Sequence, residues 1–277
     1  MTSKLTFERV TGHIGALVSG LDITKPLSDN DFEALRLGLA EHLVLFFRDQ
    51  EMSPPQHRDF AARFGRLAVH PTFPCADGIP EVTVLDYDEK NKSKVEEWHA
   101  DMTFKPHPPL GSVLMAQIIP PTGGDTLFAS SVAAFEGLSD RWQHFLDGLY
   151  ATHSFTHGFR HTLAEPGAYD RLRGAIADNP PVAHPVVRTH PVTGKKGLFV
   201  NEVFTTQIVG MSESESRAVL DFLYRHAATP EYVCRFKWEP NSVAFWDNRA
   251  TLHRPVNDYW PARRRMQRVV VEGEKPA

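Results

Sequence analysis

Short apolar runs with the composition of β-strands recur along most of the chain, and a few stretches of helical periodicity lie between them. β-Branched and aromatic residues are concentrated in runs such as VLFFRD, EVTVLDYD, SVLMAQII, EYVCRFKW, SVAFWDN and RRMQRVVVEG. Helical spacing of Leu35, Leu39 and Leu43 behind the N-cap candidate Ser28 predicts a helix near the start. Further helices are predicted from Ser53 to Gly65, over SVAAFEGL and SDRWQHFLDGL, and over residues 212–228.

The order of these elements predicts the fold class. Strands do not alternate regularly with helices, as they would in βαβ units, so we expect a mostly β protein with peripheral helices. No repeat, linker or low-complexity tract divides residues 1–277, which predicts a single domain. The segment at about 153–181 has the least regular pattern and carries three histidines, and we expect it to form a lid.

Composition excludes several classes of protein. The 277 residues include 30 Lys+Arg and 34 Asp+Glu, a net charge of −4 that argues against nucleic-acid binding through massed phosphate contacts. Two cysteines cannot form a disulfide framework or a four-thiolate zinc site. The first ten residues have no apolar core of a signal peptide, and no run approaches the roughly 18 apolar residues of a membrane span. We therefore expect a cytoplasmic protein without a membrane partner.

The strongest candidate for chemistry is His99-Ala100-Asp101, together with His253 near the end of the chain. Residues two apart in a strand share a face, so His99 and Asp101 can point at one metal ion. A third ligand from a distant strand would complete the 2-His-1-carboxylate set of non-haem Fe(II) oxygenases. Among 14 histidines and 34 acidic residues an H-x-D tripeptide is a weak signal by itself. By its residues alone, His253 is better explained as a hydrogen-bonded histidine in a polar loop.

Longer strings give a more specific signal. In order along the chain, WHADMTF, PPTGGDTLFAS, HPVVRTHPVTGKKGLFVNEVFTT and WDNRATLHRPVNDYWPARRRMQR resemble the taurine dioxygenase (TauD/TfdA) family of Fe(II)- and 2-oxoglutarate-dependent oxygenases. The resemblance implies a double-stranded β-helix, or jelly roll, with His99, Asp101 and His253 as Fe(II) ligands. It also implies 2-oxoglutarate and O2 as cosubstrates, with Thr126 and Arg264 binding the distal carboxylate of 2-oxoglutarate.

The arginine-rich strand near the end of the chain bears on these roles. Alternation places Arg264, Met266 and Arg268 on one face, and we expect Arg264 and Arg268 to point inward. The alternative is an ordinary solvated edge strand. The resemblance implies that Arg268 binds the anionic group of the substrate and that His70 is a second substrate contact.

The resemblance also defines a substrate cavity with Phe73, Phe159 and Phe204 as further wall residues. The chain departs from the taurine pattern at three positions: Phe73 replaces a tyrosine, Val95 an asparagine and Gly158 a serine. Each change removes a polar group, which weakens the case for taurine itself. We expect hydroxylation of a small organic acid, an alkanesulfonate such as taurine or a less polar relative, with oxidative C–S or C–O cleavage and with succinate and CO2 as co-products.

Several alternatives stay open at this point. The same chemistry can act on a carboxylate or another natural product. A zinc hydrolase can use the same three ligands, but it gives Arg264 and Thr126 no reason to lie near the metal. A non-catalytic jelly-roll binding protein would ordinarily have lost a ligand. The resemblance further implies a homodimer or homotetramer, and Trp98, Asp247 and Asn248 are expected to orient the ligands rather than to react.

Overall fold

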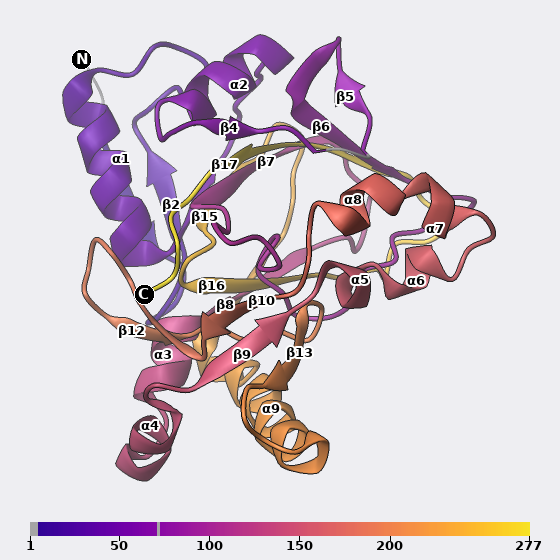
Figure 1. The fold of residues 1–277 in the computed structure, drawn as a ribbon. Coiled ribbons are helices and arrows are strands. Elements are labelled where there is room, and N and C mark those ends of the chain that lie inside the picture. Colours follow the sequence, from indigo (N-terminus) through magenta and orange to yellow (C-terminus); the bar gives the residue numbers. More distant parts are fainter. Residues whose placement is uncertain (1–4, 71–72) are drawn as a thin grey trace.

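The computed structural model describes residues 5–70 and 73–277 and is built around one large sheet (Figure 1). The strand order is β1-β2-β3-β15-β7-β17-β6-β5, with β4 paired to β17, and all pairs are antiparallel except β2 with β3. These strands are β1 (Thr6–Arg9), β2 (Ala16–Ser19), β3 (Val44–Phe47), β4 (Leu67–Ala68), β5 (Cys75–Ala76), β6 (Ile79–Tyr87), β7 (Gly111–Ile118), β15 (Val243–Asp247) and β17 (Arg264–Val271).

Three smaller sheets and a set of helices complete the fold. One sheet has the order β14-β8-β16, a second β10-β9-β13, and β11 pairs with β12. Their strands are β8 (Thr126–Ser130), β9 (Tyr150–His153), β10 (Val182–Pro185), β11 (Val187–Thr189), β12 (Lys196–Leu198), β13 (Thr205–Ile208), β14 (Val233–Phe236) and β16 (Thr251–Pro255). The helices are α1 (Asp29–His42), α2 (Pro54–Ala62), α3 (Ser131–Glu136), α4 (Asp140–Leu146), α5 (Phe155–Gly158), α6 (Arg160–Leu163), α7 (Ala168–Arg171), α8 (Arg173–Ala177), α9 (Glu213–Ala227) and the 3₁₀ helix η1 (Pro230–Tyr232).

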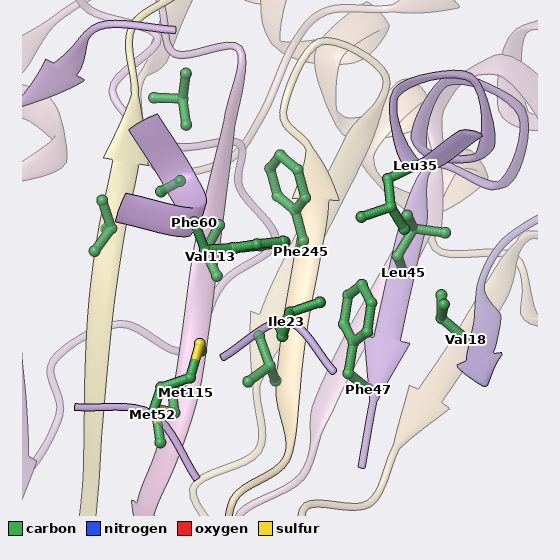
Figure 2. Close-up of a cluster of buried hydrophobic side chains, with 14 of the residues drawn as sticks. Val18, Ile23, Leu35, Leu45, Phe47, Met52, Phe60, Val113, Met115 and Phe245 are labelled. Atoms are coloured by element: carbon green, nitrogen blue, oxygen red, sulfur yellow. The ribbon is translucent and has the colours of Figure 1, made fainter. Parts of the chain in front are cut away.

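The central strands of the large sheet are buried on both faces. In β3, Leu45 and Phe47 pack under α1 and α2, as Figure 2 shows, while Phe46 points the other way. The ring of Phe46 stacks on Phe236 of β14 with 4.1 Å between centroids. Burial on both faces explains why these strands have continuous apolar sequences rather than alternating ones. The large sheet therefore forms a layer between helices α1 and α2 on one face and the β14-β8-β16 sheet on the other.

Local signals in the sequence position the longer helices as predicted. The Ser28 side chain accepts a hydrogen bond from the backbone N–H of Asp31 and begins α1, which ends where Leu43 adopts φ 66°. Capping boxes at Ser53 with Gln56 and at Ser212 with Glu215 begin α2 and α9. None of the helices in the described residues is both long enough and apolar enough to cross a bilayer.

The segment at about 153–181, whose sequence pattern is the least regular, folds into the short helices α5 to α8. His153 ends β9 as a fully buried residue that is hydrogen-bonded to Thr103. Helices of four or five residues have too few turns to show a 3.6-residue period, so the pattern gave no sign of them. The sequence pattern also did not predict the strands β9, β13 and β16. They are largely polar, and four or five residues are too few to show a clear two-residue alternation.

Acid should destabilise this fold through the buried His57 of α2. Its Nε2 donates to the Val113 carbonyl at 3.1 Å, and burial lowers its pKa from 6.5 to about 4. Between these two pH values the unfolded chain binds a proton that the folded chain does not, so stability falls as pH falls, by about 1.4 kcal/mol per pH unit from this residue. Urea unfolding at several pH values should show a shallower loss for His57→Gln and an unchanged loss for the exposed His107→Gln; equal slopes in the wild type and His57→Gln would contradict this.

Candidate metal centre and active site

Two of the predicted ligands meet through their own backbones. The N–H of His99 donates to the carbonyl of His253 at 3.0 Å, and the N–H of His253 donates back at 2.7 Å. Residues that exchange both bonds in an antiparallel pair project their side chains to the same side. The two imidazole rings accordingly lie 4.1 Å apart between centroids. His253 belongs to β16, whereas His99 makes an isolated bridge in the loop before β7.

Asp101 is held by contacts to its backbone and to its carboxylate. Asn248 accepts from the N–H of Asp101 at 2.7 Å and donates to its carbonyl at 3.0 Å, which clamps the peptide from both sides. Ser112 of β7 donates to Oδ2 at 2.8 Å, and Arg268 of β17 donates to Oδ1 at 3.1 Å. A turn rather than a strand thus directs Asp101, with Met102 at φ 48° immediately after it.

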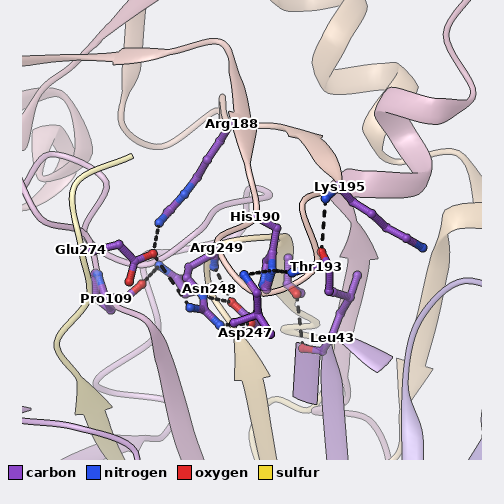
Figure 3. A network of polar contacts seen from close by, with 12 residues as sticks. Leu43, Pro109, Arg188, His190, Thr193, Lys195, Asp247, Asn248, Arg249 and Glu274 are labelled. Carbon is purple, nitrogen blue, oxygen red and sulfur yellow. Dashed lines mark hydrogen bonds and ion pairs between the residues drawn. The ribbon is translucent and has the colours of Figure 1, made fainter. Parts of the chain in front are cut away.

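A polar network behind this clamp fixes the turn that carries Asn248 (Figure 3). Both oxygens of the buried Asp247 accept from the Arg249 guanidinium, and Oδ2 also accepts from Nε2 of His190 at 2.9 Å. His190 therefore has a structural role. Asp247 and Asn248 lie next to the metal ligands and not among them, as expected for residues that orient the ligands.

The three side chains fit a divalent metal ion in both position and protonation state. One ligand atom from each of His99, Asp101 and His253 lies within 4.8 Å of the others, and all three residues are buried. Burial lowers the pKa of His99 and lowers that of His253 to about 3, so both rings are neutral at pH 7. Burial alone would raise the pKa of Asp101, but Arg268 and the two histidines keep it below its usual range. Neutral imidazoles and an ionised carboxylate are the forms that bind metal.

Hydrogen bonding also selects the nitrogen of His99 that faces the metal. The Glu97 carbonyl can only accept, so the contact of 3.0 Å means that Nδ1 of His99 carries the proton. Nε2 then keeps its lone pair for a metal ion. Such a contact to the second nitrogen is the usual way in which proteins orient a metal-ligating histidine.

Every predicted site residue lies on the wall of one cavity of about 820 Å³. This volume lies in the upper part of the usual range for small-molecule sites, roughly 300–1,000 Å³. The cavity residues predicted from the sequence are His99, Asp101 and His253, the pair Thr126 and Arg264, and the set His70, Phe73, Val95, Gly158, Phe159, Phe204 and Arg268. The structure therefore brings together residues that are spread over the last three quarters of the chain.

Arg264 is the most unusual group in this cavity. Its side chain is buried, Nε donates to the Gly124 carbonyl at 3.0 Å, and the guanidinium lies 5.8 Å above the Trp238 ring. The indole N–H of Trp238 donates to the Thr126 hydroxyl at 3.0 Å, which places that hydroxyl beside the same pocket. Within the described ranges, no carboxylate lies within ion-pair distance of Arg264. A buried guanidinium without an acidic partner is a ready site for an anionic ligand.

The alternation predicted for β17 is confirmed. Arg264 and Arg268 line the cavity, whereas Arg263 pairs with Asp86 at the surface. The strand is not a solvated edge, because β7 lies on one side of it and β6 on the other.

Sequence reasoning missed two contributors. Ser112 gave no signal, because a serine at the start of an apolar strand is ordinary. Gly124 did give a signal, because two adjacent glycines indicate a backbone that other residues rarely adopt. Gly123 and Gly124 both have left-handed conformations, with φ 75° and 73°. A side chain at Gly124 would meet Pro120 and Arg264, so the pair of glycines lets the loop reach the arginine.

This geometry defines a class of protein. A buried 2-His-1-carboxylate set with room beside it is the ligand arrangement of the non-haem Fe(II) oxygenases. Residues 6–270 match the family model described as "Taurine catabolism dioxygenase TauD, TfdA family", and the chain belongs to this family. It is therefore an Fe(II)- and 2-oxoglutarate-dependent dioxygenase, which excludes the zinc hydrolase and the non-catalytic binding protein.

Relatives and solved structures agree with this assignment. An alkylsulfatase from Acinetobacter baylyi is 35% identical, and the match covers 99% of this chain and 86% of that protein. An alpha-ketoglutarate-dependent sulfate ester dioxygenase from Pseudomonas putida is 33% identical, with 99% of this chain and 91% of the relative covered. The crystal structure of a taurine dioxygenase from Burkholderia xenovorans has a TM-score of 0.85 at 36% identity, covering 99% of this chain and 91% of that one.

Loss of the Asn248 clamp should weaken metal binding without unfolding the protein. The Asn248→Ala variant frees both backbone groups of Asp101, so we expect its Mn(II) affinity to fall about tenfold or more, as is usual for residues that orient metal ligands. Titration followed by the loss of the free Mn(II) electron paramagnetic resonance signal measures the affinity directly. Asn179→Ala, which removes a contact to the Ala175 carbonyl away from the metal, is the matched control. Equal affinities in the wild type and Asn248→Ala would remove Asn248 from this role.

Proposed function

We propose that this dioxygenase oxidises a small organic sulfonate or sulfate ester at the carbon that bears the anionic group. The observation that carries the proposal is the pair of cavity arginines, Arg264 and Arg268, which lie on one strand beside the predicted metal ligands. Two anionic reactants, 2-oxoglutarate and the substrate, require two separate cationic sites. The names of the alkylsulfatase and of the sulfate ester dioxygenase support a sulfate or sulfonate as the second anion.

Arg264 binds 2-oxoglutarate in this proposal. Its fork-shaped guanidinium matches a carboxylate, and the hydroxyl of Thr126 adds a neutral hydrogen bond beside it. The distal carboxylate of 2-oxoglutarate then supplies the acidic partner that Arg264 lacks within the described part of the chain. This contact directs the keto acid end of the molecule toward His99, Asp101 and His253.

Arg268 binds the anionic group of the substrate. It is close to the metal site, since its Nη1 contacts the Asp101 carboxylate, and it lies four residues from Arg264 on the same face of β17. Burial and the charge of Arg268 lower the pKa of His70 to about 4, so His70 is neutral at pH 7 and contributes hydrogen bonding rather than charge. The positive charge is thus concentrated at Arg268.

Iron held by His99, Asp101 and His253 would supply activation of dioxygen, so that one oxygen atom enters succinate as 2-oxoglutarate loses CO2 and the other is inserted into a C–H bond of the substrate. The chain positions the reactants and excludes water. When the hydroxylated carbon also bears a sulfate or sulfonate, the C–O or C–S bond breaks as the new hydroxyl loses its proton and becomes a carbonyl. The products are then an aldehyde and sulfate or sulfite.

We also propose how the sheets form the scaffold. The large sheet and the β14-β8-β16 sheet lie face to face through the Phe46, Phe128 and Phe236 cluster. We interpret the two sheets as a double-stranded β-helix, or jelly roll, within a single domain. The helices α5 to α8 supply Gly158, Phe159 and Leu172 to the cavity wall and act as its lid.

The role of Arg264 predicts a selective defect. In Arg264→Ala the distal carboxylate loses a charge-assisted bidentate contact of about 2 kcal/mol or more, so the KM for 2-oxoglutarate should rise roughly 30-fold or more. Steady-state succinate formation measures this KM. Arg263→Ala, in which only the surface pair with Asp86 is lost, should leave it unchanged. An unaltered KM in a folded Arg264→Ala protein would assign 2-oxoglutarate to another group.

The substrate class is tested by succinate production from the Fe(II)-loaded protein with 2-oxoglutarate and O2. We expect stimulation by alkyl sulfates or alkanesulfonates, with an aldehyde and sulfate or sulfite in equal amounts. In Arg268→Ala, the KM for the anion should rise by about tenfold or more. Stimulation by aryloxy-carboxylates instead, or by none of these anions, would contradict the proposed substrate.

A further inference from the structure

Gly158 is a glycine because of its neighbour and not because of its backbone. It ends α5 outside the left-handed region, where any residue is tolerated. A Cβ atom built at this position would lie 2.2 and 2.3 Å from two ring carbons of Phe204, distances at which the ring must move. The ring of Phe204 therefore occupies the space that any other residue at position 158 would need.

The ring has little freedom to move away from the lid. The N–H of Phe204 donates to the Asn201 side chain at 2.9 Å, and its carbonyl accepts from the N–H of Ser154 at 2.9 Å. The backbone is thus anchored on both sides. The ring packs against Phe104, 5.1 Å away between centroids, and its remaining side faces the cavity. A side chain at position 158 would consequently push the ring into the space available for substrate.

Phe204 belongs to an apolar wall that begins next to the metal ligands. The buried members of this cluster are Phe104, Phe155, Val203 and Phe204, and partly buried Val95, Met102 and Phe159 pack on it. Met102 follows Asp101 directly in the chain and Phe104 comes two residues later, so the wall starts beside the predicted metal centre. A hydrocarbon chain attached to an anion held by Arg268 can lie along this surface.

The cavity also lacks a partner for an ammonium group. Its carboxylates among the described residues are Asp86, Asp101 and Glu165, and each has a cationic partner already, in Arg263, Arg268 and Lys94 respectively. A zwitterion would have to place its ammonium group against the apolar wall without a counter-charge, which is unfavourable.

We propose that Phe204, seated against Gly158, determines specificity: it makes the wall continuous for an unsubstituted alkyl chain and excludes substrates with an ammonium group at the far end. The inference rests on the proposed function, because it assumes that Arg268 holds the anionic end. It predicts that the length and polarity of the chain, rather than the anionic group alone, decide which substrate reacts.

The experiment compares ethyl, butyl and hexyl sulfate, and butyl with 4-aminobutyl sulfate, in the Fe(II)-loaded protein. For the wild type, kcat/KM should rise about fourfold per added methylene, as burial of a methylene predicts. The amino group should lower it about tenfold or more. In Gly158→Ala and Gly158→Ser the displaced ring should abolish the gain with length, so that ethyl, butyl and hexyl sulfate react with similar kcat/KM. The two variants should behave alike, because the cause is the Cβ atom and not the hydroxyl.

Two further variants separate this effect from general damage to the lid. Gly174→Ala changes a glycine in α8 whose added Cβ meets nothing within 4 Å, and it should retain the wild-type dependence on length. Combining Gly158→Ala with Phe204→Leu makes room at the same place and should restore the preference for hexyl sulfate, a coupling that independent defects would not show.

The outcomes distinguish the two proposals. If neither the alkyl sulfates nor the corresponding alkanesulfonates stimulate the wild type, the proposed substrate class is wrong and this inference falls with it. If the wild type reacts and Gly158→Ala keeps the same dependence on length, or if 4-aminobutyl sulfate reacts as well as butyl sulfate, the proposed function stands and the role of Phe204 is wrong.

Discussion

The reciprocal backbone hydrogen bonds between His99 and His253 are the constraint on which the site depends. They join a loop before β7 to β16 across more than half of the chain, and they direct both imidazoles to the same side. β16 in turn pairs with β8, where His253 lies opposite Phe128. The metal centre therefore exists only after the small sheet has assembled, because nothing local to either histidine fixes the distance between the rings. Asn248 adds the third ligand by a second long-range clamp, on the backbone of Asp101.

Charge in the cavity follows from this arrangement. Asp101 is the only carboxylate of the predicted ligand set, while Arg264 and Arg268 bring two cations to the same wall, even before a divalent metal adds its own charge. A buried excess of positive charge is unfavourable unless anions neutralise it. Two anionic reactants provide that neutralisation. Arg268 touches Asp101 as well as the cavity, so in the proposed function the substrate anion and the Asp101 carboxylate share one guanidinium.

Much of this arrangement was readable from the sequence, and the failures have physical causes. Helix caps, continuous apolar runs and alternating faces are local patterns. They correctly predicted the longer helices, the central strands and the inward face of β17. The one-turn helices α5 to α8 lie below the length at which periodicity is detectable. The contact of Ser112 with Asp101 is invisible because it depends on the pairing of distant segments. At Gly158 the sequence showed a departure from the family pattern. It did not show that Phe204 occupies the space beside this glycine, because only the fold brings the two residues together.

The metal ligands and the helical side of the apolar wall differ in the contacts that hold them in place. Arg264 and Arg268 lie on β17, which is paired on both sides, and His253 lies on β16, which pairs with β8 and bridges to His99. Asp101 is tied to this core through Asn248 and Ser112. Gly158 and Phe159, in contrast, come from α5 and the turn that follows it, where the contacts are mainly aromatic rings packed on one another. A substitution in this helical segment can reshape the cavity with little effect on the metal ligands. The same scaffold can therefore accept different organic anions while the oxidative chemistry stays the same, since the two depend on separate parts of the structure.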